Sequence, residues 1–431
     1  MGERGKLPQI GKYPVLRRLG EGATSEVYLC RDTFNQRDVA VKVAFPHTFD
    51  DPESGKLFKS LFLTEASLAG KLQHPHIVQI YDAVAEPDLH YIVMEYVDGG
   101  TLERFCKPEA LLPVERVVEM MFKCTRALEF AQRQGVTHRD IKPANILHTG
   151  ATHVKITDFG AAMLASAEHT QVTQVGSPTY MSPEQVKEQP LDHRTDIYSI
   201  GVVMYHLLAG KAPFYAPNNF SMLYQITGGE VKPPSVHRPE LSPRVDQIVL
   251  RAMARNLEER YARWADFSAD LVELFREERG EARKAQDFAD SDRFETLRRL
   301  AFFQEFSDAE LWEVARISDW RHADAGQTLM REGQPGEDFC ILADGEVKVT
   351  RRGKLLNVLK PGEPFGEMAY LSRKERKRGA DVTVTAEANV ISLATGKLEQ
   401  VSEGCRHKFD RAFMGILVER LSAANLRLSG V

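Results

Sequence analysis

A charged stretch between Arg276 and Arg293 divides the chain into two parts with different hydrophobic patterns. It reads REERGEARKAQDFADSDR and contains almost no large apolar residue, so it favours an exposed linker or a solvated helix over a buried element. The 431 residues also exceed what one ordinary hydrophobic core organises. We therefore predict two domains, at residues 13–276 and 294–431, joined by a charged linker at residues 277–293.

The first part has the pattern of a small sheet followed by a larger helical region. From Tyr13 to about Asp98, segments such as RDVAVKV and HYIVMEYV are rich in β-branched and apolar residues and predict strands, with one helix at residues 57–72. From Leu102 onwards, apolar residues recur at helical spacing, as in VVEMMFKCTRALEFAQRQG, which ends at Gly135. The pattern indicates an α+β domain with two lobes.

The second part has the pattern of an all-β roll with flanking helices. A helical stretch, LRRLAFFQEFSDAELWEVARI, precedes a glycine-punctuated run from Trp320 to Leu398 in which strand signals recur every ~8–12 residues. We expect a strand pair with Gly345 at its turn. The closing helix has an apolar face that either packs on the roll or pairs with a second subunit in a homodimer. This face consists of Phe409, Phe413, Ile416, Leu417 and Leu421.

Composition indicates a globular protein that stays in water. Hydrophobic residues make up 43% and charged residues 27%, and no apolar run approaches the ~20 residues that span a bilayer. The first residues lack the apolar segment of a secretory signal, and a net charge of -5 gives no electrostatic reason to expect nucleic acid or an anionic membrane as a partner. Five scattered cysteines predict buried free thiols. We expect a cytoplasmic protein.

Several polar residues stand in patterns typical of nucleotide chemistry. In GEGATSEV, Gly20 and Gly22 let backbone amides approach phosphate oxygens because no Cβ is in the way. Lys42 follows in the apolar strand VAVKV, where its charge needs a partner, and Glu65 on the predicted helix is the expected partner. The stretch THRDIKPANIL places three further polar side chains on one loop, and KITDFG places Asp158 at the end of a strand.

These separated motifs, in this order, make the first part of the chain resemble the protein kinase family. The resemblance implies that Lys42 grips the α- and β-phosphates of ATP and that Glu65 holds Lys42. Asn145 and Asp158 would supply oxygen ligands to Mg²⁺, a hard cation. Asp140 would accept and orient the hydroxyl of the protein substrate. The fold implied is the two-lobed protein kinase fold, class α+β.

The resemblance also implies a nucleotide pocket and a substrate class. Lys142 follows the pattern of serine/threonine rather than tyrosine kinases, and HPHIVQIYDA and MSPEQ are similar to the bacterial branch. Adenine would lie between Val27 and Ala40 on one side and Leu147 on the other, with Met94 at the rear. The implied ATP-binding residues are Gly20, Glu21, Gly22, Ala23, Val27, Ala40, Lys42, Glu95, Val97 and Leu147.

The stretch GSPTYMSPEQ is similar to the segment with which the family receives its substrate peptide. Ser177 would lie near the catalytic loop, and Ser182 stands where alanine is commoner in the family. Glu184 is expected to form a buried ion pair with Arg260, whose loss would leave an unpaired charge. Asp196 is expected to support the backbone of the catalytic loop.

The segment between Asp158 and Glu184 contains two candidate phosphorylation sites. A phosphate there would have a cation to dock on at Arg139, next to the predicted base. Thr170 and Thr173 are the candidates. The alternative, that both are only exposed loop residues, stays open.

The roll resembles the cyclic nucleotide-binding domain family through REGQPGE, CILADGEVKV and FGEMAYL. In that family the FGE segment forms a short helix whose amides face the cyclic phosphate, the glutamate takes the ribose hydroxyl, and an arginine neutralises the phosphate. Aligning the closing strand puts Ala380 at that arginine's position, and Arg378 or Arg376 substitutes only if the loop is remodelled. The candidate pocket residues are Gly366, Glu367, Met368, Ala369 and Arg378.

Two interpretations of this pocket stay open. It binds a cyclic nucleotide, or it is a degenerate module that serves contacts or takes another anion. The displaced arginine favours the second, because the loss of one bidentate contact costs about 2–3 kcal/mol.

The sequence predicts a regulated protein serine/threonine kinase that uses ATP and Mg²⁺, with the roll acting on the kinase through an intramolecular contact. A pseudokinase scaffold that binds nucleotide without phosphoryl transfer is the alternative. The full set of catalytic residues argues against it. This set consists of Lys42, Glu65, Asp140, Lys142, Asn145 and Asp158.

Overall fold

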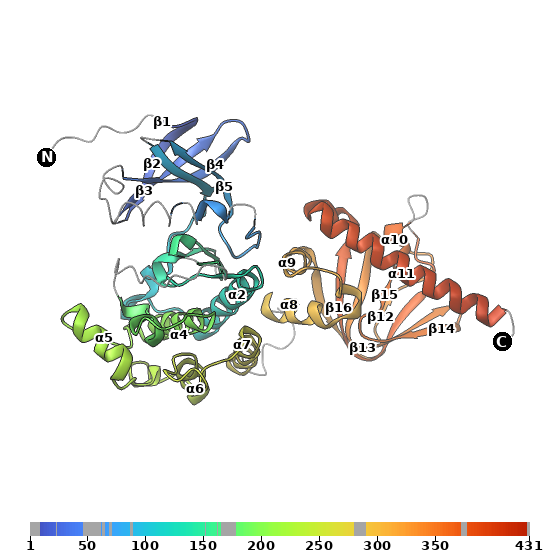
Figure 1. Cartoon of the computed structure of the whole chain (residues 1–431). Helices are drawn as coiled ribbons and strands as arrows, with labels where there is room; N and C mark the ends of the chain where they lie inside the picture. The colour runs from blue at the N-terminus through green and yellow to red at the C-terminus, as the bar shows by residue number, and fades with distance from the viewer. Residues whose placement is uncertain are drawn as a thin grey trace. The chain divides into compact units, whose positions relative to one another are not determined.

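A computed structural model shows a chain of two compact units, Met1–Glu278 and Arg279–Val431 (Figure 1). The division falls within the charged stretch. The helix α7 (Trp264–Arg279) and the helix α8 (Asp290–Arg299) reach into the predicted linker from its two ends. The structure describes residues 9–22, 24–45, 62, 65–68, 71–86, 89–150, 152–161, 163–164, 178–279, 290–371 and 377–428.

The first unit begins with a six-stranded antiparallel sheet in the order β1-β2-β3-β4-β6-β5. Apolar side chains alternate across it: Val39 and Val41 lie in a core on one face, and Ala40 in a second core on the other. Lys42, two residues after Ala40, shares the second face because side chains alternate with a period of two. The strands are β1 (Gln9–Ile10), β2 (Tyr13–Glu21), β3 (Ser25–Asp32), β4 (Arg37–Ala44), β5 (Ile80–Glu86) and β6 (Leu89–Glu95).

The rest of the first unit is helical, as the spacing of apolar residues predicts (Figure 1). Its central helix α4 is buried along most of its length, and a Cβ at Gly201 would lie 2.8 Å from the Cβ of Ala252 in α6, so this glycine permits close helix packing. Besides α7, the helices are α2 (Val114–Arg133), α3 (Pro183–Val186), α4 (Arg194–Ala209), α5 (Asn219–Gly228) and α6 (Pro243–Ala252).

Two short strand pairs flank the predicted catalytic loop, residues 138–145. They are β7 (Val136–Thr137) with β10 (Met163–Leu164), and β8 (Ile146–Thr149) with β9 (His153–Ile156). Short 3-10 turns complete the unit: η2 (Leu102–Phe105), η3 (Pro108–Ala110), η4 (Pro143–Asn145), η5 (Phe159–Ala161), η6 (Pro178–Tyr180) and η7 (Pro234–Val236).

The second unit is a β-roll whose two long strands, β13 and β16, pair along most of their length. The order β11-β16-β13-β14 is antiparallel, with β12 on β16 and β15 on β13. The strands are β11 (Asp319–Ala323), β12 (Thr328–Met330), β13 (Asp338–Arg351), β14 (Lys354–Leu359), β15 (Pro364–Phe365) and β16 (Asp381–Ala394). Besides α8, the helical elements are η9 (Ala301–Phe303), α9 (Asp308–Ile317), α10 (Met368–Leu371), η10 (Thr395–Gln400) and α11 (Glu403–Leu428).

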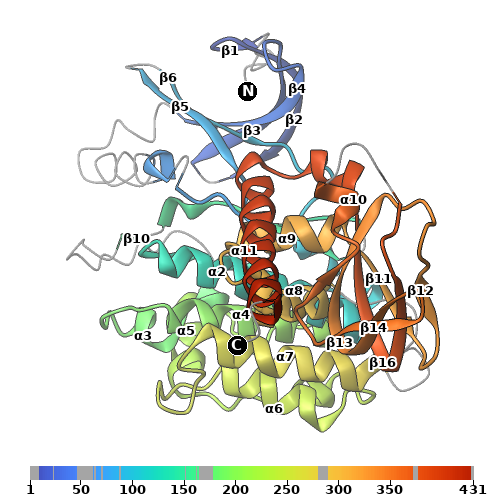
Figure 2. The ribbon, with the colours of Figure 1, turned by 90° about the vertical axis from the view of Figure 1, so that its right-hand side faces the viewer.

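Aromatic side chains attach the helices to the roll. Phe409 and Phe413 of α11 are fully buried and contact Phe302 and Phe339, so this part of the closing helix packs on its own roll (Figure 2). Leu417, predicted on the same apolar face, is exposed. The face therefore splits into a buried start and an exposed continuation.

One strand prediction is wrong. Gly345 does not form the turn of a strand pair but lies inside the continuous strand β13, where the register shifts. Its φ is 89°, and a Cβ there would collide with the backbone of Glu387 and Ala388, so the glycine permits a bulge. All five cysteines are buried and free, as predicted. Most of the helix predicted at residues 57–72 lies outside the described residues.

In the part of the chain that the structure describes, no helix is both long enough and apolar enough to cross a membrane.

Candidate active site

Three charged side chains from distant parts of the first unit meet at Lys42. The Nζ of Lys42 on β4 lies 3.0 Å from Oε2 of Glu65 and 2.7 Å from Oδ1 of Asp158. Glu65 is buried, whereas Asp158 is 40% exposed and can also face a ligand. The structure thus brings together the cation and both carboxylates that the sequence analysis singled out.

The protonation states follow from this geometry. Burial alone would lower the pKa of Lys42, but the charges of Asp158 and Glu65 outweigh it and hold this pKa above its ordinary value. The charge of Lys42 lowers the pKa of Asp158. The pKa of Glu65 is raised, because burial outweighs the attraction of Lys42. Lys42 is therefore a permanent cation and Asp158 an anion at neutral pH.

The predicted catalytic loop places two polar side chains against one carboxylate. Lys142 Nζ lies 2.7 Å from Oδ2 of Asp140, and Asn145 Nδ2 donates to the same oxygen at 3.0 Å and to the backbone oxygen of Asp140 at 2.8 Å. The Asp140 side chain is 40% exposed, so it is oriented by two donors and still accessible to a substrate.

The backbone before Asp140 is held by side chains. Oδ2 and Oδ1 of Asp196 in α4 accept hydrogen bonds from the amides of His138, at 2.7 Å, and Arg139, at 2.8 Å, as the resemblance implied. The amide of Asp140 donates to Nδ1 of His138 at 3.2 Å, so Nε2 carries the proton and donates to the Thr157 carbonyl at 3.0 Å. These bonds tie the loop both to α4 and to the segment before Asp158.

The donor set fits a hard divalent cation such as Mg²⁺. Asn145 commits Nδ2 to Asp140, so its side-chain oxygen is the atom suited to a metal. The amide of Thr157 donates to the Asn145 carbonyl at 2.9 Å, which places the residue before Asp158 against Asn145. An anionic carboxylate and an amide oxygen on adjacent backbone are ligands that Mg²⁺ takes alongside phosphate oxygens.

The residues predicted for adenine lie in one hydrophobic cluster. Ala40 and Met94 belong to its buried part, and Val27, Val97 and Leu147 pack against it. This cluster lines the same sheet face as Lys42, so an apolar surface for a planar ring adjoins the charged triad. The sheet and the β8 strand both contribute to it, as the prediction requires.

Two further parts of the predicted ATP site are Glu95 and the glycine-rich hairpin. Glu95, at the end of β6, is held through its side chain by Lys155 at 2.8 Å. Gly20 and Glu21 lie in the hairpin of β2 and β3, opposite Val27 and Glu26. Among the residues that the structure describes, none has a heavy atom within 4 Å of a Cβ at Gly20, and the amide of Gly22 donates to the Ser25 carbonyl at 2.8 Å.

The helix α3 is held by a buried ion pair, as predicted. Glu184 lies 2.7 and 3.1 Å from the two terminal nitrogens of Arg260, and Thr195 donates to the same carboxylate at 3.0 Å. Burial would raise the pKa of Glu184, but the hydrogen bond and charge of Arg260 outweigh this and lower it. Glu184 is therefore an anion whose charge is balanced inside the protein.

Some predicted residues cannot be placed. Ala23, Thr170, Thr173, Ser177 and Arg376 lie outside the described residues. The position of Ala369 is given by α10, but its side chain is not described.

In the second unit, one of the two arginines that the sequence analysis named as substitutes lies at the predicted pocket. Arg378, not Ala380, reaches the FGE segment: its guanidinium donates to the Gly366 carbonyl at 3.4 Å and pairs with Asp338 at 2.5 Å. Arg378 reaches this position, two residues before Ala380, because its backbone amide donates to the carbonyl oxygen of Gln334 at 2.7 Å. A Cβ at Gly336 or Gly366 would collide with this guanidinium, so the two glycines make room for it.

The rest of this pocket is a short turn of helix. Gly366 has a φ of 75°, Glu367 is half-buried, and Met368, which begins α10, is exposed. Asp338, which accepts from Ser392 at 2.8 Å, already neutralises Arg378. An anion at this place would therefore compete with an internal carboxylate.

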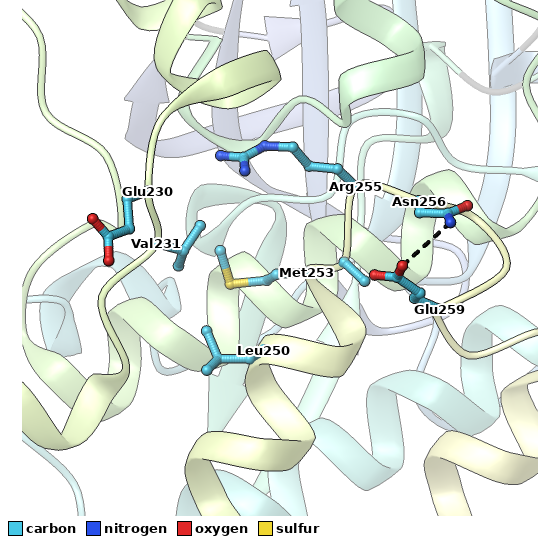
Figure 3. Close-up of a pocket in the computed structure, with 8 residues that line it drawn as sticks. Glu230, Val231, Leu250, Met253, Arg255, Asn256 and Glu259 are labelled. Carbon is cyan, nitrogen blue, oxygen red and sulfur yellow. Dashed lines mark hydrogen bonds between the residues drawn. The ribbon is translucent and has the colours of Figure 1, made fainter.

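A surface cavity of about 440 Å³ lies elsewhere on the first unit, between the segment after α5 and the end of α6 (Figure 3). Val231, Leu250 and Met253 form its apolar part, and Arg255 is bound by the carbonyls of Ile226 at 2.8 Å and Gln225 at 3.2 Å. The residues that line this cavity all differ from those around Lys42 and Asp140, so it is not the candidate active site.

Two residues of the site were missed from the sequence. Lys155 pairs with Glu95, as described above, and Gln185 in α3 donates to the Arg139 carbonyl at 2.8 Å. The spacing of Ser182 and Gln185 is the signature of a helix capping box, which could have identified α3. The second bond of Gln185 had no local signal, because its partner is 46 residues away.

Comparisons with known proteins agree with this geometry. Residues 13–274 match the family model described as the protein kinase domain, and residues 320–404 match the one described as the cyclic nucleotide-binding domain. Both resemblances seen in the motifs are thereby confirmed.

Named relatives are bacterial kinases. The chain is 40% identical to serine/threonine-protein kinase PknB of Mycobacterium leprae (strain TN) over 287 residues, which is 65% of this chain and 45% of that protein. It is 39% identical to the protein of the same name from Mycobacterium tuberculosis (strain ATCC 25618 / H37Rv) over 298 residues, 67% of this chain and 47% of that protein. The chain thus spans less than half the length of these relatives.

Proposed function

Because the chain belongs to the protein kinase family, we propose that it transfers the γ-phosphoryl group of ATP to serine or threonine hydroxyls of protein substrates. The observation that carries this proposal is the convergence of Lys42, Glu65 and Asp158 next to an apolar cluster. A structural role alone would not require a half-buried lysine that meets two carboxylates, one of which, Asp158, is 40% exposed. Since ATP is an intracellular substrate, we place this activity in the cytoplasm.

The surroundings of each residue in this site are compatible with a specific role in phosphoryl transfer. Lys42, a permanent cation, binds phosphate oxygens once ATP competes for it with Asp158. Asp140, held by Lys142 and Asn145, orients the substrate hydroxyl and accepts its proton. Mg²⁺, when bound by Asn145 and Asp158, neutralises charge on the phosphates. Phosphoryl transfer depends mainly on such positioning and charge stabilisation.

A phosphotransfer assay tests the proposal. The full chain is incubated with ATP labelled in the γ-phosphate, Mg²⁺ and a generic protein substrate, beside the variant Asp140→Asn. We expect label on serine or threonine in the wild type only. Equal label with both proteins would discredit the assignment.

The pseudokinase alternative predicts a different result. A scaffold would bind a fluorescent ATP analogue in both proteins and transfer label in neither. The complete set of polar residues around Lys42 and Asp140 favours transfer over scaffolding.

We further propose that the second unit regulates the first by an intramolecular contact. The support is the presence of a cyclic nucleotide-binding domain in the same chain as a kinase domain. Arg378 and Glu367 are the groups of its pocket that would bind a ligand, but Arg378 already forms an ion pair with Asp338. A modified response to cyclic nucleotides is therefore part of this proposal, with a phosphorylated loop at Thr170 or Thr173 as a second input.

A further inference from the structure

The side chain of Gln185 has both ends of its amide bonded to backbone. At the start of α3, the backbone amide of Ser182 donates to Oε1 of Gln185 at 3.0 Å, and the amide of Gln185 donates to Oγ of Ser182 at 3.3 Å. This is a reciprocal capping box. The other end, Nε2, donates to the carbonyl oxygen of Arg139 at 2.8 Å.

The orientation of this amide follows from its partners. Only the oxygen can accept from the Ser182 amide, and only the nitrogen can donate to the Arg139 carbonyl. Gln185 is buried, with 7% of its surface exposed, so water does not readily replace either bond. One side chain therefore connects α3 directly to the predicted catalytic loop.

The carbonyl that Gln185 holds belongs to a strained residue next to the proton acceptor. Arg139 has a φ of 68°, which a non-glycine residue adopts only when its surroundings impose it. Asp196 binds the amide of Arg139, and Gln185 binds its carbonyl. The peptide plane between Arg139 and Asp140 is thus held at its carbonyl by Gln185 and at its amide by Nδ1 of His138, and its orientation sets the direction of the Asp140 side chain.

We propose that Gln185 is a positioning residue for phosphoryl transfer, acting on Asp140 through the Arg139 carbonyl. The inference rests on the proposed kinase function. It goes beyond that function because it makes the start of α3, where the stretch similar to the substrate-receiving segment ends, part of the orientation of the base. A displacement of α3 would then be transmitted to Asp140 without any change at Lys42.

The variant Gln185→Glu separates the two bonds of this side chain. A carboxylate keeps an oxygen for the Ser182 amide, so the capping box stays, but it replaces the donor to Arg139 by an acceptor. We expect kcat to fall on the order of tenfold or more, with the KM for ATP within about twofold of wild type. The KM should hold because the Lys42 site is unchanged.

Two further variants control for folding. Ser182→Ala removes the hydroxyl of the capping box and keeps the bond from Gln185 to Arg139, so kcat should stay within about twofold even if Tm falls. Gln185→Met removes the donor to Arg139, together with the acceptor for the Ser182 amide, without adding a charge, and should lower kcat like Gln185→Glu. It also decides the matter if the glutamate variant does not fold.

Specific outcomes overturn the inference. It fails if Gln185→Met and all folded Gln185 variants keep the wild-type kcat, or if Ser182→Ala lowers kcat as much as they do at an equal loss of Tm. If the wild type itself transfers no phosphate while binding ATP, the proposed function has failed instead, and the two failures are distinguishable.

Discussion

At the scale of single residues, the first unit places charges and titratable groups in buried or half-buried positions. Lys42 is stable in an apolar strand only because two carboxylates face it. His74 is buried and its pKa is lowered to about 3 by burial, with smaller contributions from Arg126 and Lys155. Each of these residues supports a prediction.

Replacing Lys42 by methionine keeps the apolar stem and removes the charge. We expect kcat/KM for phosphoryl transfer to fall on the order of 10²–10³-fold, because one preorganised charge contact to the phosphates is lost. Steady-state assays measure it. The exposed Lys187→Met is the matched control and should leave the activity unchanged. A Lys42→Met enzyme with wild-type kcat/KM would show that the cation does not contact the phosphates.

Because the pKa of the buried His74 is lowered, we expect the folded protein to lose stability in acid. The folded pKa of this residue is depressed, so between about pH 6.5 and pH 3 the unfolded chain binds a proton that the folded chain does not. The free energy of unfolding then falls as the pH drops, by at most about 1.4 kcal/mol per pH unit for this residue.

The variant His74→Asn tests this sign. It removes the titrating ring and retains an acceptor for the amide of His76, which donates to Nδ1 of His74 at 3.1 Å. Denaturation of both proteins from pH 7.5 to pH 5 should show a shallower pH dependence for the variant. Parallel curves would mean that His74 does not titrate differently in the two states.

At the scale of elements, α3 is attached to the helical lobe by the pair of Glu184 and Arg260. Arg260 also donates to the carbonyls of Arg194 and Ala254, at 2.8 and 2.9 Å. The ion pair is therefore the centre of a buried network. Removing one partner leaves the charge of the other buried and unpaired.

The variant Arg260→Met should lower the free energy of unfolding by about 3–5 kcal/mol, since Glu184 stays buried without its cation. The double variant Glu184→Gln/Arg260→Met should recover part of this loss, because the stranded charge is gone. Chemical denaturation measures both. A double variant less stable than the sum of its two single variants would contradict this account.

The contact of Arg378 with Asp338 predicts weak cyclic nucleotide binding. Burial would raise the pKa of Asp338, but bonds from Ser392 and the charge of Arg378 outweigh this and lower it, so a cyclic phosphate meets an anion already in place. Calorimetric titration of the full chain with cyclic AMP and cyclic GMP should show affinities weaker than about 1 μM. Micromolar or tighter binding would refute the altered pocket.

At the scale of the whole molecule, two units with separate cores share one chain. Regulation requires that the second unit change the activity of the first. We predict that a chain ending at Arg293 differs from the full chain in kcat, KM or autophosphorylation. Identical values in parallel assays, with Asp140→Asn versions of both as blanks, would remove the regulatory role.

Much of this organisation was predictable because it depends on local patterns. The spacing of glycines, the alternation in strands and the helical periodicity of residues 114–133 act through neighbours in the chain. The order of motifs also identified Lys42, Glu65 and Asp158 as a group. The bulge at Gly345 was mistaken for a turn because a glycine with positive φ is compatible with both, and only strand pairing distinguishes them.

By itself, the sequence determined the resemblance to two families, their fold classes and the grouping of Lys42, Glu65 and Asp158, since each is encoded by short segments. Only the tertiary structure decided that Arg378 reaches Gly366 and that Gln185 holds Arg139. These contacts join segments far apart in the chain, and the path of the intervening backbone determines which atoms meet. The sequence shows which side chains are able to form hydrogen bonds and ion pairs, and the tertiary packing determines which of them form a bond with one another.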